Sequence, residues 1–503
     1  MERTDRCTMR KHRYVLFAFV VGLVSMVFSV GRWNIPAFAF IWPVCILFAF
    51  RQIRTRRVLI SASVLLMLVQ PVRYWGYTGG GFGADLAVGL IIGATVLVPV
   101  LLDRWLSPHL SARIGGWSVL LPPFLFTAVN VLADLVAPVP MLAYSQASNG
   151  ALRQIASLIG SYGLTFLIVA FAGVILYALE NKQMLKRYAI PLFGYVIVLA
   201  AAVIFGIIRG ASLIGTEERH IRTALALTAA EGEYTDGTLT IPDEAENYSY
   251  LHEKALEARL RGAELLCFAE ESFEIPDVRK EAYLYEASAA AKDQELWILF
   301  TLDVVDTDGD LGGKNVNQEF LISPSGEIIA SYSKTQLLPG PLEADDYLRG
   351  DGQILTEELL LKNGETVRVS SVICFDANHA HYVAGMDEQT ELLLIPSWCW
   401  DGCADYQADM MVFRAVENGV AVANPTIAGK TSVYDRCGNV VFRTDESKQP
   451  RSSLSVVDIP VPTNTSRTVY SRIAGVFDWL FPLGAAVMIC LVFVPGRKKR
   501  EMC

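Results

Sequence analysis

The chain opens with long apolar stretches that are separated by short polar loops. Most of these stretches approach the roughly 20 residues that a helix needs to cross the hydrocarbon core of a bilayer. The pattern therefore predicts about seven membrane-spanning helices before residue 215, and one more near the other end of the chain. They are expected at 14–30, 35–50, 58–72, 84–102, 117–136, 158–179, 190–208 and 473–494.

The charges in the loops predict how these helices are oriented. Lysine and arginine gather in the first residues of the chain and in loops 51–57, 104–113 and 182–187, whereas the intervening loops carry fewer charges. Because basic loops stay in the cytoplasm, we expect the N-terminus there and the segment after residue 208 on the outer face. The basic run 497–500 predicts that the C-terminus returns to the cytoplasm.

The segment between the spans has a different pattern, in which short β-branched or apolar runs alternate with amphipathic helical runs. Strands are expected at 223–228, 264–269, 296–305, 319–322, 328–334, 367–374, 391–396 and 420–423, and helices at 245–261, 281–294 and 405–417. This alternation predicts a layered α/β domain. We therefore divide the chain into an N-terminal transmembrane domain (1–215), an extracytoplasmic α/β domain (216–462) and a last transmembrane helix with a basic cytoplasmic tail (463–503).

Composition agrees with a membrane part and a separate globular part. The 503 residues are 52% hydrophobic, with a mean hydropathy of +0.35, which is too apolar for an ordinary soluble protein. No basic stripe with interleaved aromatic residues is present, so nucleic acid is not expected as a partner. The nine cysteines are scattered and odd in number, which argues against a disulfide framework. Cys399 and Cys403 are close, but no second pair or well-spaced histidines complete a zinc site.

Three reactive side chains follow or end apolar runs of the predicted α/β domain. Glu270 follows run 265–269, Lys334 ends run 328–334 and Cys374 ends run 368–374. Each residue alone has an ordinary explanation, since a lone cysteine is usually a small buried apolar group. Together, however, a carboxylate can take the thiol proton and an ammonium can stabilise an oxyanion, which suits covalent acyl transfer.

Glu270, Lys334 and Cys374 resemble, in type and order, the Glu-Lys-Cys triad of the nitrilase (carbon–nitrogen hydrolase) superfamily. Membrane spans, then this domain, then a last span resemble the apolipoprotein N-acyltransferase family. The resemblance covers nearly the whole chain. Its other motifs are Tyr-Ser-Gln at 144–146 with Gln154-Ile155-Ala156, Gly-x-Tyr-Gly-Leu-Thr-Phe at 160–166, Arg-Ala-x-Glu at 414–417 and the hairpin 434–438.

The chain also departs from the family pattern. The residue before Glu270 is Ala269 instead of proline, and the family's Cys-Tyr-Glu becomes Cys374-Phe375-Asp376. The loop between Lys334 and Glu343 is altered, although Glu343 still fits the role of a second glutamate that orients Lys334 or shuttles protons. These changes leave the substrate preference open more than the acyl chemistry. Glu271 is the alternative base if the strand register differs by one residue.

The resemblance implies an α-β-β-α nitrilase sandwich on a polytopic helical domain in the cytoplasmic (inner) membrane. It also implies a ping-pong mechanism, in which Glu270 activates Cys374 to take an acyl chain from a phospholipid. Lys334 and the Phe375 N–H would stabilise the oxyanion, and the thioester would then pass to the α-amine of a diacylglyceryl-cysteine lipoprotein. Phospholipid, diacylated lipoprotein and membrane lipid are thus the implied partners. We expect a monomer, with no cofactor and no metal.

Two other functions fit the same sequence features. A membrane-anchored amidase or hydrolase would pass the acyl group to water, and a non-catalytic membrane protein would only bind lipid or peptide. The presence of all three triad residue types argues against the second alternative, although a fold alone does not guarantee activity.

Overall fold

The computed structural model divides the chain into two compact units, residues 1–208 with 473–503, and residues 209–472. The predicted basic tail, the end of the last predicted span at Val494 and the segment 214–217 lie outside the described residues. The described residues are 2–138, 140–183, 185–213, 218–227, 234–235, 238–239, 244–340, 343–444, 453–463 and 467–493.

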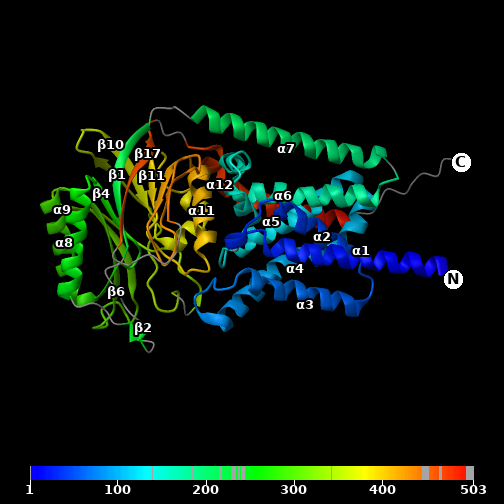
Figure 1. Ribbon diagram of the computed structural model, residues 1–503, viewed down its shortest axis with the longest axis horizontal. Helices are drawn as coiled ribbons and strands as arrows, with labels where there is room; N and C mark the ends of the chain where they lie inside the picture. The colour runs from blue at the N-terminus through cyan, green and yellow to red at the C-terminus, as the bar shows by residue number, and fades with distance from the viewer. Residues whose placement is uncertain are drawn as a thin grey trace. The chain divides into compact units, whose positions relative to one another are not determined.

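The first unit is a bundle of helices that run alongside one another (Figure 1). A helix is present at every apolar stretch that the sequence pattern marked. These helices are α1 (Glu2–Val27), α2 (Phe38–Gln52), α3 (Arg56–Arg73), α4 (Gly81–Ile114), α5 (Leu121–Ala133), α6 (Ala156–Glu180), α7 (Leu185–Leu213) and α12 (Val469–Phe493).

Fewer stretches than predicted are both long and apolar enough to cross a membrane by themselves. Among the described residues there are four, namely Gly81–Ala133, Leu152–Glu180, Tyr188–Leu213 and Val469–Phe493. The apolar helices His12–Val27 and Phe38–Gln52 are shorter, and α3 has arginines at both ends. The chain is a membrane protein, but only part of the predicted span count is met by length and composition.

The motifs at 143–146 and 160–166 form one polar junction inside the first unit. The short 3₁₀ helices η3 (Leu142–Gln146) and η4 (Leu152–Ile155) lead into α6, which is kinked at Gly160 with φ 66°. Gln146 Nε2 donates to the Pro36 carbonyl at 3.0 Å, and Ala143 N–H donates to Thr165 Oγ1 at 3.2 Å. Buried side chains of these motifs thus satisfy backbone groups where the chain is not α-helical.

The second unit is built on two β-sheets. The larger sheet has the strand order β17-β1-β4-β6-β7-β8, with β5 (Phe273–Pro276) paired to β6, and the other sheet has the order β16-β15-β13-β11-β10-β9. The strands of the larger sheet are β1 (Glu218–Ala226), β4 (Leu265–Phe268), β6 (Trp297–Val305), β7 (Val316–Ile322), β8 (Ile328–Ser333) and β17 (Leu454–Pro462). Those of the other sheet are β9 (Leu355–Leu360), β10 (Thr366–Ser371), β11 (Leu392–Leu394), β13 (Ala421–Asn424), β15 (Ser432–Tyr434) and β16 (Val440–Arg443).

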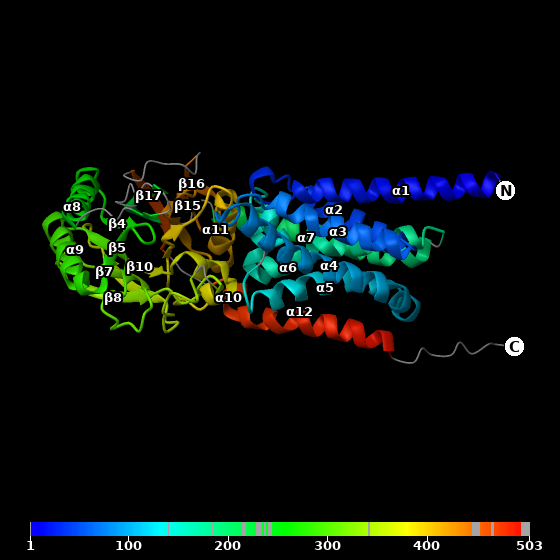
Figure 2. The ribbon, with the colours of Figure 1, turned by 90° about the horizontal axis from the view of Figure 1, so that it is seen from below.

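Helices cover the outer faces of the two sheets, which makes four layers (Figures 1 and 2). Helices α8 (Glu244–Leu260) and α9 (Lys280–Gln294) cover the larger sheet, and α11 (Ala404–Asn418) covers the other. Strand β4 is buried on both sides: Leu266 and Phe268 join the core under α8 and α9, whereas Leu265 and Cys267 join the core between the sheets. This alternation follows from the two-residue period of a strand. The predicted α-β-β-α sandwich is confirmed.

Some elements were missed by the pattern. Strand β17 pairs antiparallel with β1 over its whole length, from Glu218↔Pro462 to Ala226↔Leu454. Residues 323–326 and 435–438 form the turns that connect the antiparallel pairs β7–β8 and β15–β16. Two small ribbons complete the unit, β2 (Tyr234–Thr235) with β3 (Thr238–Leu239), and β12 (Ser397–Trp398) with β14 (Thr426–Ile427).

Candidate active site

The three candidate residues lie just beyond the ends of strands from both sheets. Glu270 follows β4 and Lys334 follows β8, while Cys374 opens the short 3₁₀ helix η7 (Cys374–Asn378) after β10. The prediction that the strand continues to Cys374 is wrong. The reason is local, because the Ile373 N–H donates to the Asp376 carboxylate at 3.0 Å and so begins a turn.

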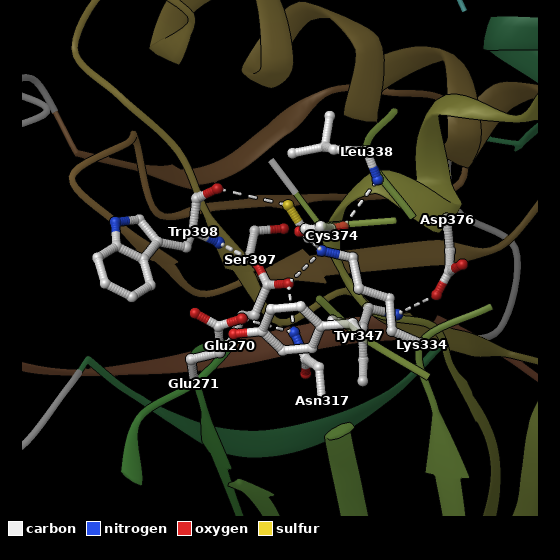
Figure 3. Close-up of polar contacts among 12 residues, drawn as sticks. Glu270, Glu271, Asn317, Lys334, Leu338, Tyr347, Cys374, Asp376, Ser397 and Trp398 are labelled. Carbon is white, nitrogen blue, oxygen red and sulfur yellow. Dashed lines mark hydrogen bonds and ion pairs between the residues drawn. The ribbon is translucent and has the colours of Figure 1, made fainter. Parts of the chain in front are cut away.

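Lys334 connects two carboxylates in the centre of this site (Figure 3). Its Nζ lies 2.7 Å from Glu270 Oε1 and also contacts Glu343 Oε1. Lys334 is 1% exposed and Glu270 is 2% exposed. The other oxygen of Glu343 accepts from the Leu338 N–H at 2.8 Å, which fixes Glu343 despite the altered loop. Pro341 and Leu342 of that loop lie outside the described residues.

The backbone of Trp398 connects Cys374 with Glu270. Cys374 Sγ donates to the Trp398 carbonyl at 3.4 Å, and the Trp398 N–H donates to Glu270 Oε2 at 2.7 Å (Figure 3). The structure thus brings all three predicted residues into one network, although Glu270 and the thiol meet through this peptide. Sequence reasoning missed Trp398 because only its backbone takes part. The signal that could have found it is the predicted strand 391–396, which ends just before it.

Asn317 in β7 contacts both of the neighbouring glutamates, Glu270 and Glu271. Its Nδ2 donates to Glu270 Oε1 and to Glu271 Oε1, each at 2.9 Å. Glu271 has a left-handed φ of 50° and lies partly exposed, without an ion pair to Lys334 among the described residues. Burial and the nearby carboxylates of Asp303 and Glu270 raise the pKa of Glu271 well above its usual value. Asn317 and Asp303, which are cross-strand partners, were not predicted.

The backbone at Cys374 has an unusual conformation for a non-glycine residue. Its φ is 44°, and such strain is often found at functional sites. The Cys374 N–H donates to the Pro396 carbonyl at 2.8 Å, whereas the next N–H, that of Phe375, has no hydrogen-bond partner among the described residues. Cys374 is partly exposed, so a substrate can reach its sulfur beside a free N–H donor.

Burial and charge set the protonation of the site in opposite directions for Lys334 and Cys374. Burial alone would lower the pKa of Lys334, but the carboxylates of Glu270 and Glu343 raise it further, so the net pKa is above its usual value. Burial and the Glu270 carboxylate raise the pKa of Cys374, against the opposing effect of Lys334. The resting site therefore holds an ammonium and a neutral thiol, which needs a base before it can attack.

Hydrogen bonds to Asp376 connect the end of the strand that precedes Lys334 with the turn that contains Cys374. Its carboxylate accepts from Tyr332 OH at 2.7 Å and from the Thr335 N–H at 3.1 Å, in addition to the Ile373 N–H. Burial raises the pKa of Asp376 to about 7. The shorter acid that replaces the family's glutamate thus has a structural use in this chain.

The cysteine pattern needs one correction. We expected no disulfide framework, and the structure joins Cys399 to Cys403 in a single disulfide with a Cα–Cα distance of 6.4 Å. The short sequence separation of Cys399 and Cys403 does not by itself predict a disulfide, because such a bond depends on the distance and direction of the two side chains in space. In the described part of the chain, only Asp277, Asp306 and Asp308 bring three ligand oxygens within 4.8 Å of one another, and no triad residue belongs to that group.

Comparison with known proteins agrees with both halves of the chain. The carbon–nitrogen hydrolase family model matches residues 228–466, and the model of the apolipoprotein N-acyltransferase N-terminal domain matches residues 10–174. An amidase structure from Nesterenkonia sp. is similar with 20% identity and a TM-score of 0.41, over 54% of this chain and 100% of the amidase.

Named relatives span most of the chain. It is 26% identical over 376 residues to the apolipoprotein N-acyltransferase of Geobacter metallireducens. This alignment covers 71% of this chain and 70% of the relative. It is 23% identical over 430 residues to apolipoprotein N-acyltransferase 1 of Treponema denticola. This alignment covers 75% of this chain and 77% of the relative. Since one family model matches the membrane half and the other the sandwich, the chain belongs to the apolipoprotein N-acyltransferase family of the nitrilase superfamily and is an acyltransferase.

Proposed function

We propose that the protein transfers a fatty acyl chain from a phospholipid to the N-terminal amine of diacylglyceryl-cysteine lipoproteins through a thioester on Cys374. The observation that carries this proposal is the continuous buried network from Glu343 through Lys334 and Glu270 to the Trp398 backbone, which ends at the partly exposed thiol. The names of the relatives supply the lipoprotein acceptor.

In the first half-reaction, Glu270 takes the proton from Cys374 and the thiolate attacks the acyl ester carbonyl. Glu270 suits the role of base because hydrogen bonds from Lys334, Asn317 and Trp398 fix the position of its carboxylate in the network that ends at the thiol. The developing oxyanion lies within the reach of the Lys334 ammonium and the free Phe375 N–H. The ester C–O bond then breaks, and Glu270 returns the proton to the departing lysophospholipid alcohol.

In the second half-reaction, the amine of the lipoprotein attacks the thioester carbonyl. The new C–N bond replaces the C–S bond, Glu270 accepts the amine proton, and this proton ends on the Cys374 sulfur. The amine must enter as the free base, because an ammonium has no lone pair with which to attack. Water competes poorly when the site excludes it, which agrees with the buried carboxylates and the apolar core around Cys374.

The substrates also account for the two parts of the protein. Both are lipids held in a membrane, and the apolar helices of the first unit give the enzyme access to the same phase. The basic loops favour a multi-pass protein of the cytoplasmic membrane with the sandwich on the extracytoplasmic face. Lipoproteins of that face would then meet the enzyme where their lipid anchors are.

The decisive experiment separates the two half-reactions. Purified full-length enzyme is given phospholipid vesicles alone, and intact-protein mass spectrometry follows the mass of one added acyl chain. We expect this acyl-enzyme to persist and to discharge when a synthetic diacylated lipopeptide is added, with the N-acylated lipopeptide as product. A matched lipopeptide whose α-amine is already acetylated should leave the acyl-enzyme intact.

The hydrolase alternative predicts a different result. Steady release of free fatty acid from phospholipid, unchanged when the lipopeptide is added, would show that water is the acceptor. Such a result would refute the proposed transferase reaction while leaving Cys374 as the nucleophile.

A further inference from the structure

The peptide that connects the base to the thiol belongs to a very small element. Trp398 lies in the two-residue strand β12, whose only sheet partner among the described residues is the two-residue strand β14, through Ser397↔Thr426 and Trp398↔Ile427. So short a ribbon is marginal by itself. Neighbouring contacts, such as the hydrogen bond from the Ser397 N–H to the Pro425 carbonyl at 3.0 Å, help to hold Trp398 where its N–H reaches Glu270 and its carbonyl reaches Cys374.

The disulfide begins at the residue that follows Trp398. It joins Cys399 to Cys403, which are 2% and 8% exposed, and α11 starts at the next residue, Ala404. The bond therefore closes a tight loop between the end of β12 and the first turn of α11. The Cys399 N–H also donates to the Ile427 carbonyl at 2.9 Å, so Cys399 is fixed on both sides.

Helix α11 is attached to the nucleophile as well. Arg414 Nη1 donates to the Ala377 carbonyl at 3.2 Å, within the short helix η7 that Cys374 opens. Arg414 is completely buried and pairs with Glu417 at 2.9 Å, so this attachment has little freedom. The same helix thus fixes the turn that carries Cys374 and, through the disulfide, the peptide that contacts its sulfur.

We propose that Cys399 and Cys403 are positioning residues of the acyl-transfer site, whose disulfide holds the Trp398 peptide in register between Glu270 and Cys374. This inference rests on the proposed function for its substrate, but not for its geometry. Without the bond, the loop that follows Trp398 gains freedom, and both hydrogen bonds made by the Trp398 peptide weaken. Misplacement of a catalytic group by about 1 Å can cost about 100-fold in rate, so a partial loss is expected here.

The test compares Cys399→Ser, Cys403→Ser and the double variant with the wild-type full chain, and Cys437→Ser is the matched control. Cys437 is 7% exposed in the same unit and has no disulfide, so its replacement removes a buried thiol without touching the loop. The first readout is acyl-enzyme formation from phospholipid vesicles. The second is the pH profile of Cys374 alkylation by iodoacetamide, resolved by peptide mass spectrometry, which needs neither lipid substrate.

We expect acyl-enzyme formation to fall by about tenfold in each single variant and by the same factor in the double variant, because every replacement breaks the same bond. The acid limb of the alkylation profile should move to higher pH in these three variants, because the backbone contact with Trp398 that lowers the pKa of the Cys374 thiol is weakened. A loss of thermal stability alone would not move this profile. The control should match wild type in both readouts.

Reduction of the folded wild-type enzyme checks the result without any substitution. A water-soluble trialkylphosphine converts the disulfide to two thiols and takes one oxygen atom from water, and it should reproduce the slow enzyme but leave the double variant unchanged. Variants and reduced enzyme whose alkylation profile equals that of wild type would overturn the proposal, as would single effects that add in the double variant. If the profile shifts while wild type forms no acyl-enzyme from phospholipid, the positioning role stands and the proposed function fails.

Discussion

The ammonium of Lys334 lies 2.7 Å from Oε1 of Glu270, and both side chains are almost completely buried. A buried charge is tolerated only with a partner, and the carboxylates of Glu270 and Glu343 raise the pKa of Lys334 above its usual value. Glu271, the next residue, has no ion pair with this lysine in the described part of the chain and shares only Asn317 with its neighbour. The geometry favours Glu270 over Glu271 as the base.

Replacement of each glutamate by glutamine tests this choice. We expect Glu270→Gln to slow acyl-enzyme formation by about 100-fold or more, because an amide cannot take the thiol proton. Glu271→Gln should slow it far less, since that side chain reaches the network only through Asn317. Single-turnover mass spectrometry of the acyl-enzyme measures both rates. The reverse ranking would assign the base to Glu271.

The identity of the nucleophile leads to a second prediction. Cys374→Ala should form no acyl-enzyme, whereas Cys437→Ala should form it at the wild-type rate, because the latter thiol is outside the network of Lys334. The adduct should be labile to hydroxylamine, as expected for a thioester. A hydroxylamine-sensitive acyl mass that remains in Cys374→Ala would show that another residue carries the acyl chain.

The sequence singled out three residues that the structure brings into one network. Glu270 and Cys374 follow apolar runs that are largely buried in the sandwich, and such runs are readable from the sequence pattern. Strand β8, which leads to Lys334, is mostly exposed. Because strand ends of facing sheets can meet, the three residues could be grouped before the structure was known. The same three residue types, in the same order along the chain, form the known Glu-Lys-Cys triad, and this resemblance supported the grouping.

The supporting groups were not readable in the same way. Trp398 acts through its backbone, so no side-chain type marks it. Asp303 lies in a predicted strand that looked like ordinary core, and Asn317 lies two residues before the predicted strand 319–322. The end of β10 was misplaced because Asp376 accepts from the Ile373 N–H, a local contact that competes with the strand ladder. Long-range pairing hid β17 as well, since its partner β1 lies at the opposite end of the same domain.

Topology gives a third prediction, which depends only on the basic loops. A periplasmic-type reporter such as alkaline phosphatase should be active when fused after Gly215, and a cytoplasmic reporter should be active when fused after Arg500. The first fusion tests the side on which the catalytic sandwich begins, and the second tests the return of the chain. If the two fusion points lie on the same face of the membrane, the number of spans between them is even and the predicted topology is wrong.

Glu319 is a buried titratable residue that has no role in the proposed mechanism. It lies in β7 on the same face as Asn317, and it is completely buried. Burial, with smaller contributions from the Asp376 and Glu270 carboxylates, raises its pKa from 4.5 to about 8, against a hydrogen bond with Ser371 that lowers it. The folded protein therefore binds this proton more tightly than the unfolded chain does.

Glu319→Gln should remove a pH dependence of stability. The stabilising contribution of the bound proton is complete below about pH 4.5, falls as pH rises and is lost near pH 8. Relative to wild type, the melting temperature of the variant should therefore increase by several degrees between pH 5 and pH 8.5, because about 1 kcal/mol corresponds to about 2–4 °C in a domain of this size. Thermal unfolding of the full chain in detergent micelles measures this difference, and Glu327→Gln, at an exposed position just before β8 of the same sheet, serves as the control. A difference between variant and wild type that stays constant across this range would show that Glu319 is already ionised in the folded protein.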